Sequence, residues 1–184
     1  LGRHRASRLP SVAVLGLLVA FIAVWAFDGL NSYMTLFPGA PYLYEPRNWL
    51  RLTTGLLNGL ALIALVLPIY NFTVWREPVR EPGIRSIWEL LALLPVVALL
   101  VLVIQAEIGF LLYPLAILSS LGVVVLLVLI YSLIAAVVLG REGYAMSWRQ
   151  VAVPLTVGAG LALLQITAMV LLRGYLTTTL GISL

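Results

Sequence analysis

The feature that most constrains this chain is a series of apolar stretches long enough to cross a lipid bilayer as helices. A helix needs about 20 apolar residues to cross a hydrocarbon core roughly 30 Å thick. Polar or charged groups separate the stretches, which we place at residues 11–27, 52–74, 87–104, 111–139 and 151–172. The sequence therefore predicts an all-α fold: a polytopic transmembrane helix bundle with about five spans, forming a single membrane domain over residues 1–184.

The composition excludes several soluble classes of protein. Apolar residues make up 62% of the chain and charged residues 10%, whereas soluble domains have roughly 45–50% and 25%. So few polar side chains cannot cover so apolar an interior in water. Cysteine is absent, which excludes disulfides, thiolate metal sites and thiol nucleophiles.

Side chains that carry chemistry are scarce. The single histidine, His4, lies outside the apolar stretches, so paired imidazoles for an intramembrane haem are excluded. The sequence contains no nucleophile–base motif, no paired intramembrane aspartates and no phosphate loop. We therefore expect no catalytic residue, no metal and no cofactor, and we interpret the chain as a protein that is not an enzyme.

The distribution of arginine predicts the orientation of the helices. Cytoplasmic loops carry an excess of arginine and lysine. The N-terminal segment and the second and fourth loops, which share one side, hold eight arginines, and the other side holds three. We expect a multi-pass protein of the inner (plasma) membrane with its N-terminus in the cytoplasm and its C-terminus outside. Because this topology accounts for the net charge of +4, we expect no nucleic-acid partner.

The first outer loop, residues 28–50, is rich in aromatic side chains. They are Tyr33, Phe37, Tyr42, Tyr44 and Trp49. Amphipathic aromatic residues concentrate at the headgroup level, which favours an interfacial belt. The alternative is a cap over a site between the first two helices. The second loop, residues 76–85, alternates charges with prolines and is typical of a short solvated turn.

A candidate site lies where the first stretch ends and the second begins. Asp28 closes the first stretch and Arg51 opens the second from the same side, so we expect an ion pair. A carboxylate at bilayer depth costs roughly 2.5–3.5 kcal/mol on insertion scales, and a guanidinium partner lowers that cost. Three roles stay open: a structural tie, part of a proton relay, or an anion-binding arginine held by its carboxylate. The structural tie is the commonest outcome.

The second stretch adds a packing face and two polar residues. Gly55 and Gly59 have the small-xxx-small spacing, which places both on one helix face and lets another backbone approach closely. Thr54 and Asn58 are four residues apart and can form hydrogen bonds across that contact. The predicted polar cluster consists of Asp28, Arg51, Thr54 and Asn58. Gln165, in the fifth stretch, is expected to form a hydrogen bond within the bundle.

These motifs also support a resemblance. An apolar helix ending in Asp28-Gly29-Leu30-Asn31 precedes an aromatic loop, then Arg51-Leu52-Thr53-Thr54-Gly55-Leu56-Leu57-Asn58-Gly59, then Pro68. This order resembles the DUF2085 family of predicted membrane proteins over residues 12–70. That family also has an upstream Cys-His segment, which has no counterpart in this chain. The resemblance therefore implies a fold and a set of residues, without an activity or a cofactor.

The sequence leads to one main functional hypothesis. We predict an accessory or scaffolding subunit without catalytic chemistry, packed against a larger membrane complex for which a respiratory or photosynthetic assembly is a suitable host. Its partners are then the lipid bilayer and other membrane-protein subunits. The alternative is a transporter, or a lipid- or quinone-binding protein, that uses the Asp28–Arg51 cluster as its polar site. The residue inventory disfavours a third interpretation, an intramembrane enzyme.

Overall fold

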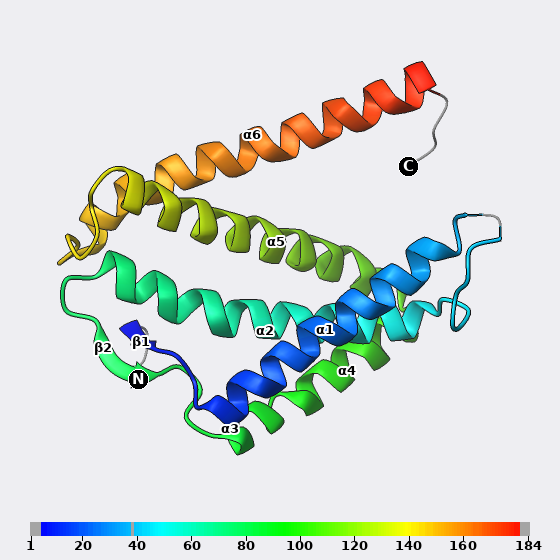
Figure 1. Cartoon of the computed structure of the whole chain (residues 1–184), viewed down its shortest axis with the longest axis horizontal. Coiled ribbons are helices and arrows are strands. Elements are labelled where there is room, and N and C mark those ends of the chain that lie inside the picture. Colours follow the sequence, from blue (N-terminus) through cyan, green and yellow to red (C-terminus); the bar gives the residue numbers. More distant parts are fainter. Residues whose placement is uncertain (1–4, 38, 181–184) are drawn as a thin grey trace. The chain divides into compact units, whose positions relative to one another are not determined.

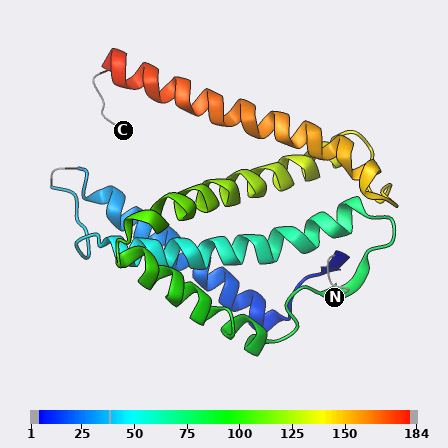
Figure 2. The same ribbon diagram turned by 180° about the vertical axis from the view of Figure 1, so that it is seen from behind.

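A computed structural model describes residues 5–37 and 39–180 and confirms the all-α architecture. The helices are α1 (Val12–Met34), α2 (Asn48–Val74), α3 (Ile87–Leu91), α4 (Leu94–Gln105), α5 (Gly109–Val138) and α6 (Trp148–Leu180). Two short strands, β1 (Ala6–Arg8) and β2 (Val79–Pro82), pair in parallel. Figures 1 and 2 show these elements from opposite sides.

Five helical segments are long and apolar enough to cross a membrane, as the sequence predicts. They are Val12–Met34, Asn48–Val74, Ile87–Gln105, Gly109–Val138 and Trp148–Thr179. Only 6–22% of the residues in the most apolar window of each segment are buried. Apolar surface exposed on this scale is unfavourable in water and is stable against lipid tails or other membrane helices.

Four of the spans differ from the predicted boundaries. Helix α6 runs from Trp148 to Leu180, beyond the predicted end at residue 172, and α2 begins at Asn48 instead of residue 52. Helix α1 continues to Met34 instead of closing at Asp28, because Asp28 is buried and hydrogen-bonded inside the fold and does not have to reach water. The third span consists of two helices, α3 and α4, which are separated at residues 92–93. Pro95 lies in the first turn of α4, where the N–H that proline lacks has no helical partner to lose.

The two strands lie in segments that the sequence does not mark as strands. Ala6 of β1 pairs with Val79 of β2, and Ser7 Oγ donates a hydrogen bond to the Val79 carbonyl at 3.0 Å. Asn71 Nδ2 of α2 donates to the Ala6 carbonyl at 2.8 Å. The charged side chains of the second loop are exposed, as expected of a solvated turn. Its residues Val79–Pro82 also pair with β1, which Asn71 holds beside the end of α2.

The chain divides into two compact units. Unit 1 comprises Leu1–Phe72 and Pro78–Leu118, and unit 2 comprises Thr73–Glu77 and Ser119–Leu184. The apolar core of unit 1 draws on α1, α2 and α3 and contains Val14, Leu18, Ala61 and Leu90. The single membrane domain predicted from the sequence stays a prediction.

Unit 2 is built around a close crossing of α5 and α6. A Cβ atom at Gly158 of α6 would lie 2.6 Å from the amide nitrogen of Ser132 and 2.7 Å from the carbonyl oxygen of Val128. No side chain fits at such distances, so the crossing requires glycine. Nearby along the two helices, the Tyr131 hydroxyl donates to Gln165 Oε1 at 2.7 Å, which confirms the hydrogen bond expected of Gln165.

Candidate functional site

The structure assembles part of the predicted polar cluster around Asp28 in α1. Asp28 is only 3% exposed. The Tyr44 hydroxyl donates to Asp28 Oδ1 at 2.5 Å, and Thr54 Oγ1 donates to Asp28 Oδ2 at 3.2 Å. Both oxygens of the carboxylate are therefore occupied by hydroxyl donors. One side chain thus joins α1, the α1–α2 loop and α2.

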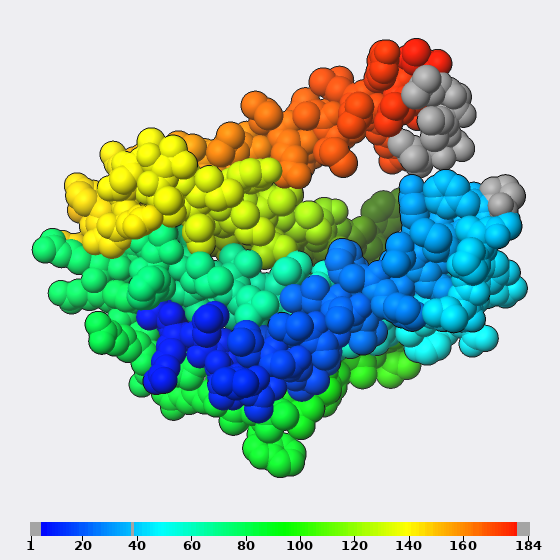
Figure 3. Space-filling view, viewed as in Figure 1, coloured from blue at the N-terminus to red at the C-terminus, as the bar shows by residue number. Residues whose placement is uncertain are grey.

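Asn31 lies one helical turn after Asp28, and its side chain holds the backbone of the same loop. Its Oδ1 accepts hydrogen bonds from the amides of Leu43 at 2.8 Å and Tyr44 at 3.4 Å. Its Nδ2 donates to the Tyr44 carbonyl at 2.8 Å. The space-filling view shows the loop packed against the C-terminal part of α1 (Figure 3). Asn31 therefore positions the Tyr44 backbone while Asp28 holds its hydroxyl.

Arg51 does not form the expected ion pair with Asp28. Within residues 5–37 and 39–180, no charged nitrogen of Arg51 lies within 4.0 Å of the Asp28 carboxylate. The Arg51 side chain is exposed, and its backbone carbonyl accepts a hydrogen bond from Thr54 Oγ1 at 3.1 Å. The guanidinium therefore lies outside the hydrogen bonds that hold the carboxylate.

Asn58 lies one turn beyond Thr54 on the same face of α2 and is 9% exposed. Its Oδ1 atom is buried and has no hydrogen-bond partner among the described residues. This oxygen therefore does not form the hydrogen bond expected of Asn58 across the contact of the Gly55–Gly59 face. A buried acceptor left unpaired costs about 1–3 kcal/mol, so this oxygen is an unfavourable feature of the cluster.

The predicted packing face of Gly55 and Gly59 is open. No heavy atom of the described chain lies within 4 Å of where a Cβ at either glycine would be. The close approach that this spacing permits occurs instead at Gly158. The sequence does contain a signal for this close approach, since the small-xxx-small spacing also occurs in both of the helices involved. It is formed by Gly158 and Ala162 in α6 and by Ser132 and Ala136 in α5, and all four residues are buried.

Sequence reasoning also misses Tyr44 and Asn31 as members of the cluster. The available signal is the spacing of Asn31 three residues after Asp28, which puts both side chains on one helix face if the helix continues. In the sequence, Tyr44 is one of several interfacial aromatic residues, and nothing nearby distinguishes it from Tyr42. Only the folded loop shows which tyrosine reaches the carboxylate.

The electrostatics favour a protonated Tyr44. The hydrogen bond to Asp28 raises the pKa of Tyr44 above its ordinary value of 10.0, and burial and the negative charge of Asp28 add to this effect. The positive charge of Arg51 acts in the opposite direction. Tyr44 therefore remains a hydrogen-bond donor at neutral pH, as the contact with Asp28 requires.

The described residues contain no group of three or more histidine or acidic side chains that could hold a metal ion. The chemistry offered by the cluster is that of one carboxylate with both oxygens hydrogen-bonded.

Comparisons with protein-family models, with curated proteins and with solved structures find no match to this chain. The resemblance to DUF2085 therefore stays a prediction, and function has to be argued from the residues themselves.

Proposed function

We propose that the chain is an accessory or scaffolding subunit without catalytic chemistry, which packs against other membrane-protein subunits of a larger complex. The observation that carries this proposal is the environment of Asp28, whose two oxygens accept hydrogen bonds from Tyr44 and Thr54. These hydrogen bonds connect α1 to the α1–α2 loop and to α2, which is what a structural tie between helices does.

The α2 face at Gly55 and Gly59 supports the same role. Small residues allow the backbone of a partner helix to approach closely, which is a main source of helix association in lipid. No part of the described chain fills the space beside either glycine. This face is therefore available to a helix of another subunit. The arginine distribution supports an inner-membrane protein with a cytoplasmic N-terminus.

A second candidate function rests on Asn58. A buried oxygen without a partner is typical of a place where a water molecule, an ion or a ligand supplies the missing donor or charge. The alternative is therefore a transporter, or a protein that binds a lipid or a quinone, with its polar site beside Asn58 and Asp28. The exposed Arg51 side chain gives this alternative no support.

Gentle detergent extraction from the native membrane, followed by native mass analysis, separates the two candidates. Migration of the chain within a complex of fixed stoichiometry is expected for a subunit. Migration as a monomer or small homo-oligomer would contradict the proposal and direct ligand-binding tests to Asn58 and Asp28.

A matched pair of variants then tests the proposed face. We expect Gly59→Leu to release the chain from the complex while its own thermal stability is kept. Gly16→Leu is the control, since Gly16 is also exposed and has no heavy atom of the described chain within 4 Å of where its Cβ would be. Equal incorporation of both variants would exclude the Gly55–Gly59 face as the contact.

A further inference from the structure

An apolar pocket of about 240 Å³ lies in unit 1 beside α2. None of the residues that line it has a polar side chain. Its walls come from α2, from β1, from the loop after β2 and from the turn between α3 and α4, and include Leu60, Ala64, Pro68, Ala6, Ile84 and Leu93. Unlike the Asp28 cluster, this pocket lies at the end of α2 that adjoins the two strands.

Along α2, the pocket extends over a length similar to the hydrocarbon thickness of one leaflet. The α2 residues that line it run from Leu60 to Pro68, about 12 Å along a helix with a rise of 1.5 Å per residue. Leu60 lies near the middle of α2, and Pro68 lies near the end to which β1 is attached. Half of a hydrocarbon core of about 30 Å is of similar length.

The lining of the pocket favours a hydrocarbon chain. Pockets that enclose a drug-sized ligand have volumes of roughly 300–1,000 Å³, so a volume of about 240 Å³ holds only part of an acyl chain. The apolar lining offers no hydrogen bond from a side chain to a ring carbonyl or hydroxyl. A single acyl chain, which needs no polar partner along its length, fits this lining better than a quinone ring does.

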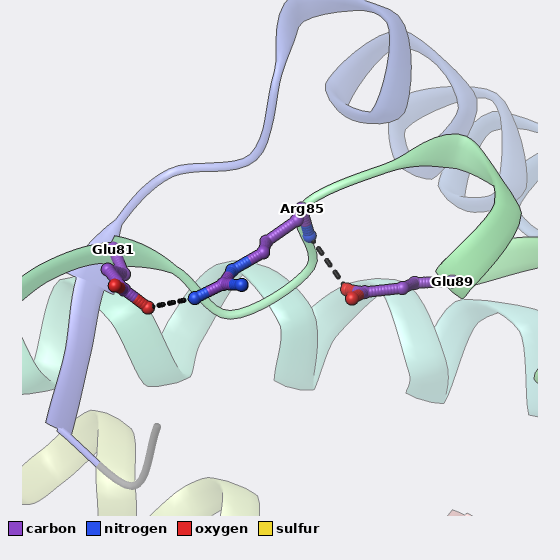
Figure 4. Close-up of polar contacts among 3 residues, drawn as sticks. All are labelled: Glu81, Arg85 and Glu89. Carbon is purple, nitrogen blue, oxygen red and sulfur yellow. Dashed lines mark hydrogen bonds and ion pairs between the residues drawn. The ribbon is translucent and has the colours of Figure 1, made fainter. Parts of the chain in front are cut away.

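Two arginines lie on the strands that adjoin the pocket, Arg8 two residues after Ala6 and Arg80 four residues before Ile84. Arg8 on β1 and Arg80 on β2 are exposed, and neither forms an ion pair with any residue in the described ranges 5–37 and 39–180. Glu81, the acidic residue next to Arg80, is paired with the Arg85 guanidinium, and the Arg85 amide donates to Glu89 Oε2 at 2.9 Å (Figure 4). Glu81 is thus held by Arg85, and the two strand arginines remain available to an anion.

We infer that this pocket binds an anionic glycerophospholipid, with one acyl chain along α2 and the headgroup phosphate beside Arg8 and Arg80. A guanidinium donates two parallel hydrogen bonds to phosphate oxygens, which gives geometric as well as electrostatic selectivity. Each arginine near an anionic lipid surface strengthens binding by about fivefold. This inference does not depend on the subunit role, since an isolated chain and a complex can both hold the lipid.

Native mass spectrometry of the full chain tests the inference. The purified protein is equilibrated in detergent with equal amounts of phosphatidylglycerol and phosphatidylcholine that have the same acyl chains. We expect phosphatidylglycerol to be retained at least about tenfold more, because two arginines face its headgroup. Equal retention of the two lipids by the wild-type protein would overturn the inference without any variant.

Two pairs of variants locate the lipid. Arg8→Gln with Arg80→Gln is expected to reduce phosphatidylglycerol retention to the phosphatidylcholine level. The charge-matched control, Arg47→Gln with Arg173→Gln, removes two exposed arginines elsewhere and is expected to keep it. The same loss in both double variants would mean that net charge alone attracts the lipid, and would overturn the proposed site.

The second pair tests the acyl-chain position. Ala64→Phe fills the pocket and is expected to lower phosphatidylglycerol retention at least about fivefold, whereas Ala98→Phe, at an exposed position of α4, leaves it unchanged. Full retention by the Ala64→Phe protein would show that the chain does not lie in this pocket. Circular dichroism and thermal unfolding without added lipid confirm that each variant is folded.

Discussion

Two helix contacts in this chain meet the same physical requirement in different ways. Apolar side chains gain little by leaving lipid for one another, so helices in a membrane need polar links or close backbone packing. The contact of α1 with α2 in unit 1 uses polar links, from Asp28 to Thr54 and to Tyr44. The contact of α5 with α6 in unit 2 adds close backbone packing at Gly158 to the hydrogen bond from Tyr131 to Gln165.

The difference shows that a small-xxx-small spacing does not by itself produce a close contact. Gly55 and Gly59 have this spacing and no neighbour within 4 Å of a side-chain carbon, whereas Gly158 lies against the backbone of Ser132. The distinguishing feature is the partner. Ser132 and Ala136 present small side chains at the same spacing on α5, and a glycine face needs such a surface opposite it to close.

The largest expected effect is the loss of the polar link. Asp28→Ala leaves the Tyr44 hydroxyl without its acceptor, while the Thr54 hydroxyl keeps the Arg51 carbonyl, and a hydrogen bond to a charged group contributes roughly 1.5–3 kcal/mol. We expect the free energy of unfolding in mixed micelles to fall by about 3 kcal/mol. Glu45→Ala, which removes an exposed acid next to Tyr44, is the control and is expected to change little. A change in Asp28→Ala as small as that expected of Glu45→Ala would mean that the Asp28 bonds contribute no stability.

The next effect concerns the close packing. Gly158→Ala places a methyl group 2.6–2.9 Å from backbone atoms of Val128 and Ser132, so the helices must move apart. Overpacking of this kind costs about 1–3 kcal/mol, and we expect a fall in unfolding free energy of that size. Gly160→Ala is the matched control on the same helix, since nothing lies within 4 Å of its added carbon. Because alanine is a better helix former, a neutral or stabilising effect is expected there.

These two contacts also show what the sequence can predict. The number and order of the spans follow from the length of each apolar stretch, because the thickness of the bilayer sets a minimum length for a helix. The sequence correctly places Thr54 and Asp28 in one cluster, because both lie at the same end of neighbouring helices. These predictions depend on distance along the chain and on membrane depth, which the sequence contains.

The remaining features depend on contacts between residues far apart in the sequence. Tyr44 reaches Asp28 because the loop is held by Asn31, and the loop path is not encoded in any local pattern. The choice between Gly59 and Gly158 as a packing site depends on the helix opposite. Pairing of Ala6 with Val79 joins segments too short to show the alternation of a strand.

A smaller effect is expected in the pH dependence of stability, because only the polar contact of α1 with α2 involves Tyr44. The pKa of Tyr44 is raised in the folded state, so its contribution to stability is fully present below pH 10 and is lost as the pH rises above that value. The wild-type protein should therefore lose stability above pH 10 more steeply than the Tyr44→Phe protein. Tyr42→Phe, in the same loop, should retain the wild-type slope. Equal slopes in all three proteins would show that Tyr44 is not linked to Asp28.

The smallest expected change in unfolding free energy is that of Arg51→Gln. Its size distinguishes the observed hydroxyl contacts of Asp28 from the ion pair that the sequence suggests. Loss of one member of a buried ion pair costs about 3–5 kcal/mol, whereas substitutions of exposed side chains usually change stability by less than about 0.5 kcal/mol. Since the Arg51 side chain is exposed and its contribution to the cluster is a backbone carbonyl, Arg51→Gln should fall in the second class. The measurement is again the unfolding free energy in mixed micelles, beside Asp28→Ala. A loss comparable to that of Asp28→Ala would mean that the guanidinium does reach the carboxylate, and that unit 1 is held by a charge pair rather than by hydroxyl donors.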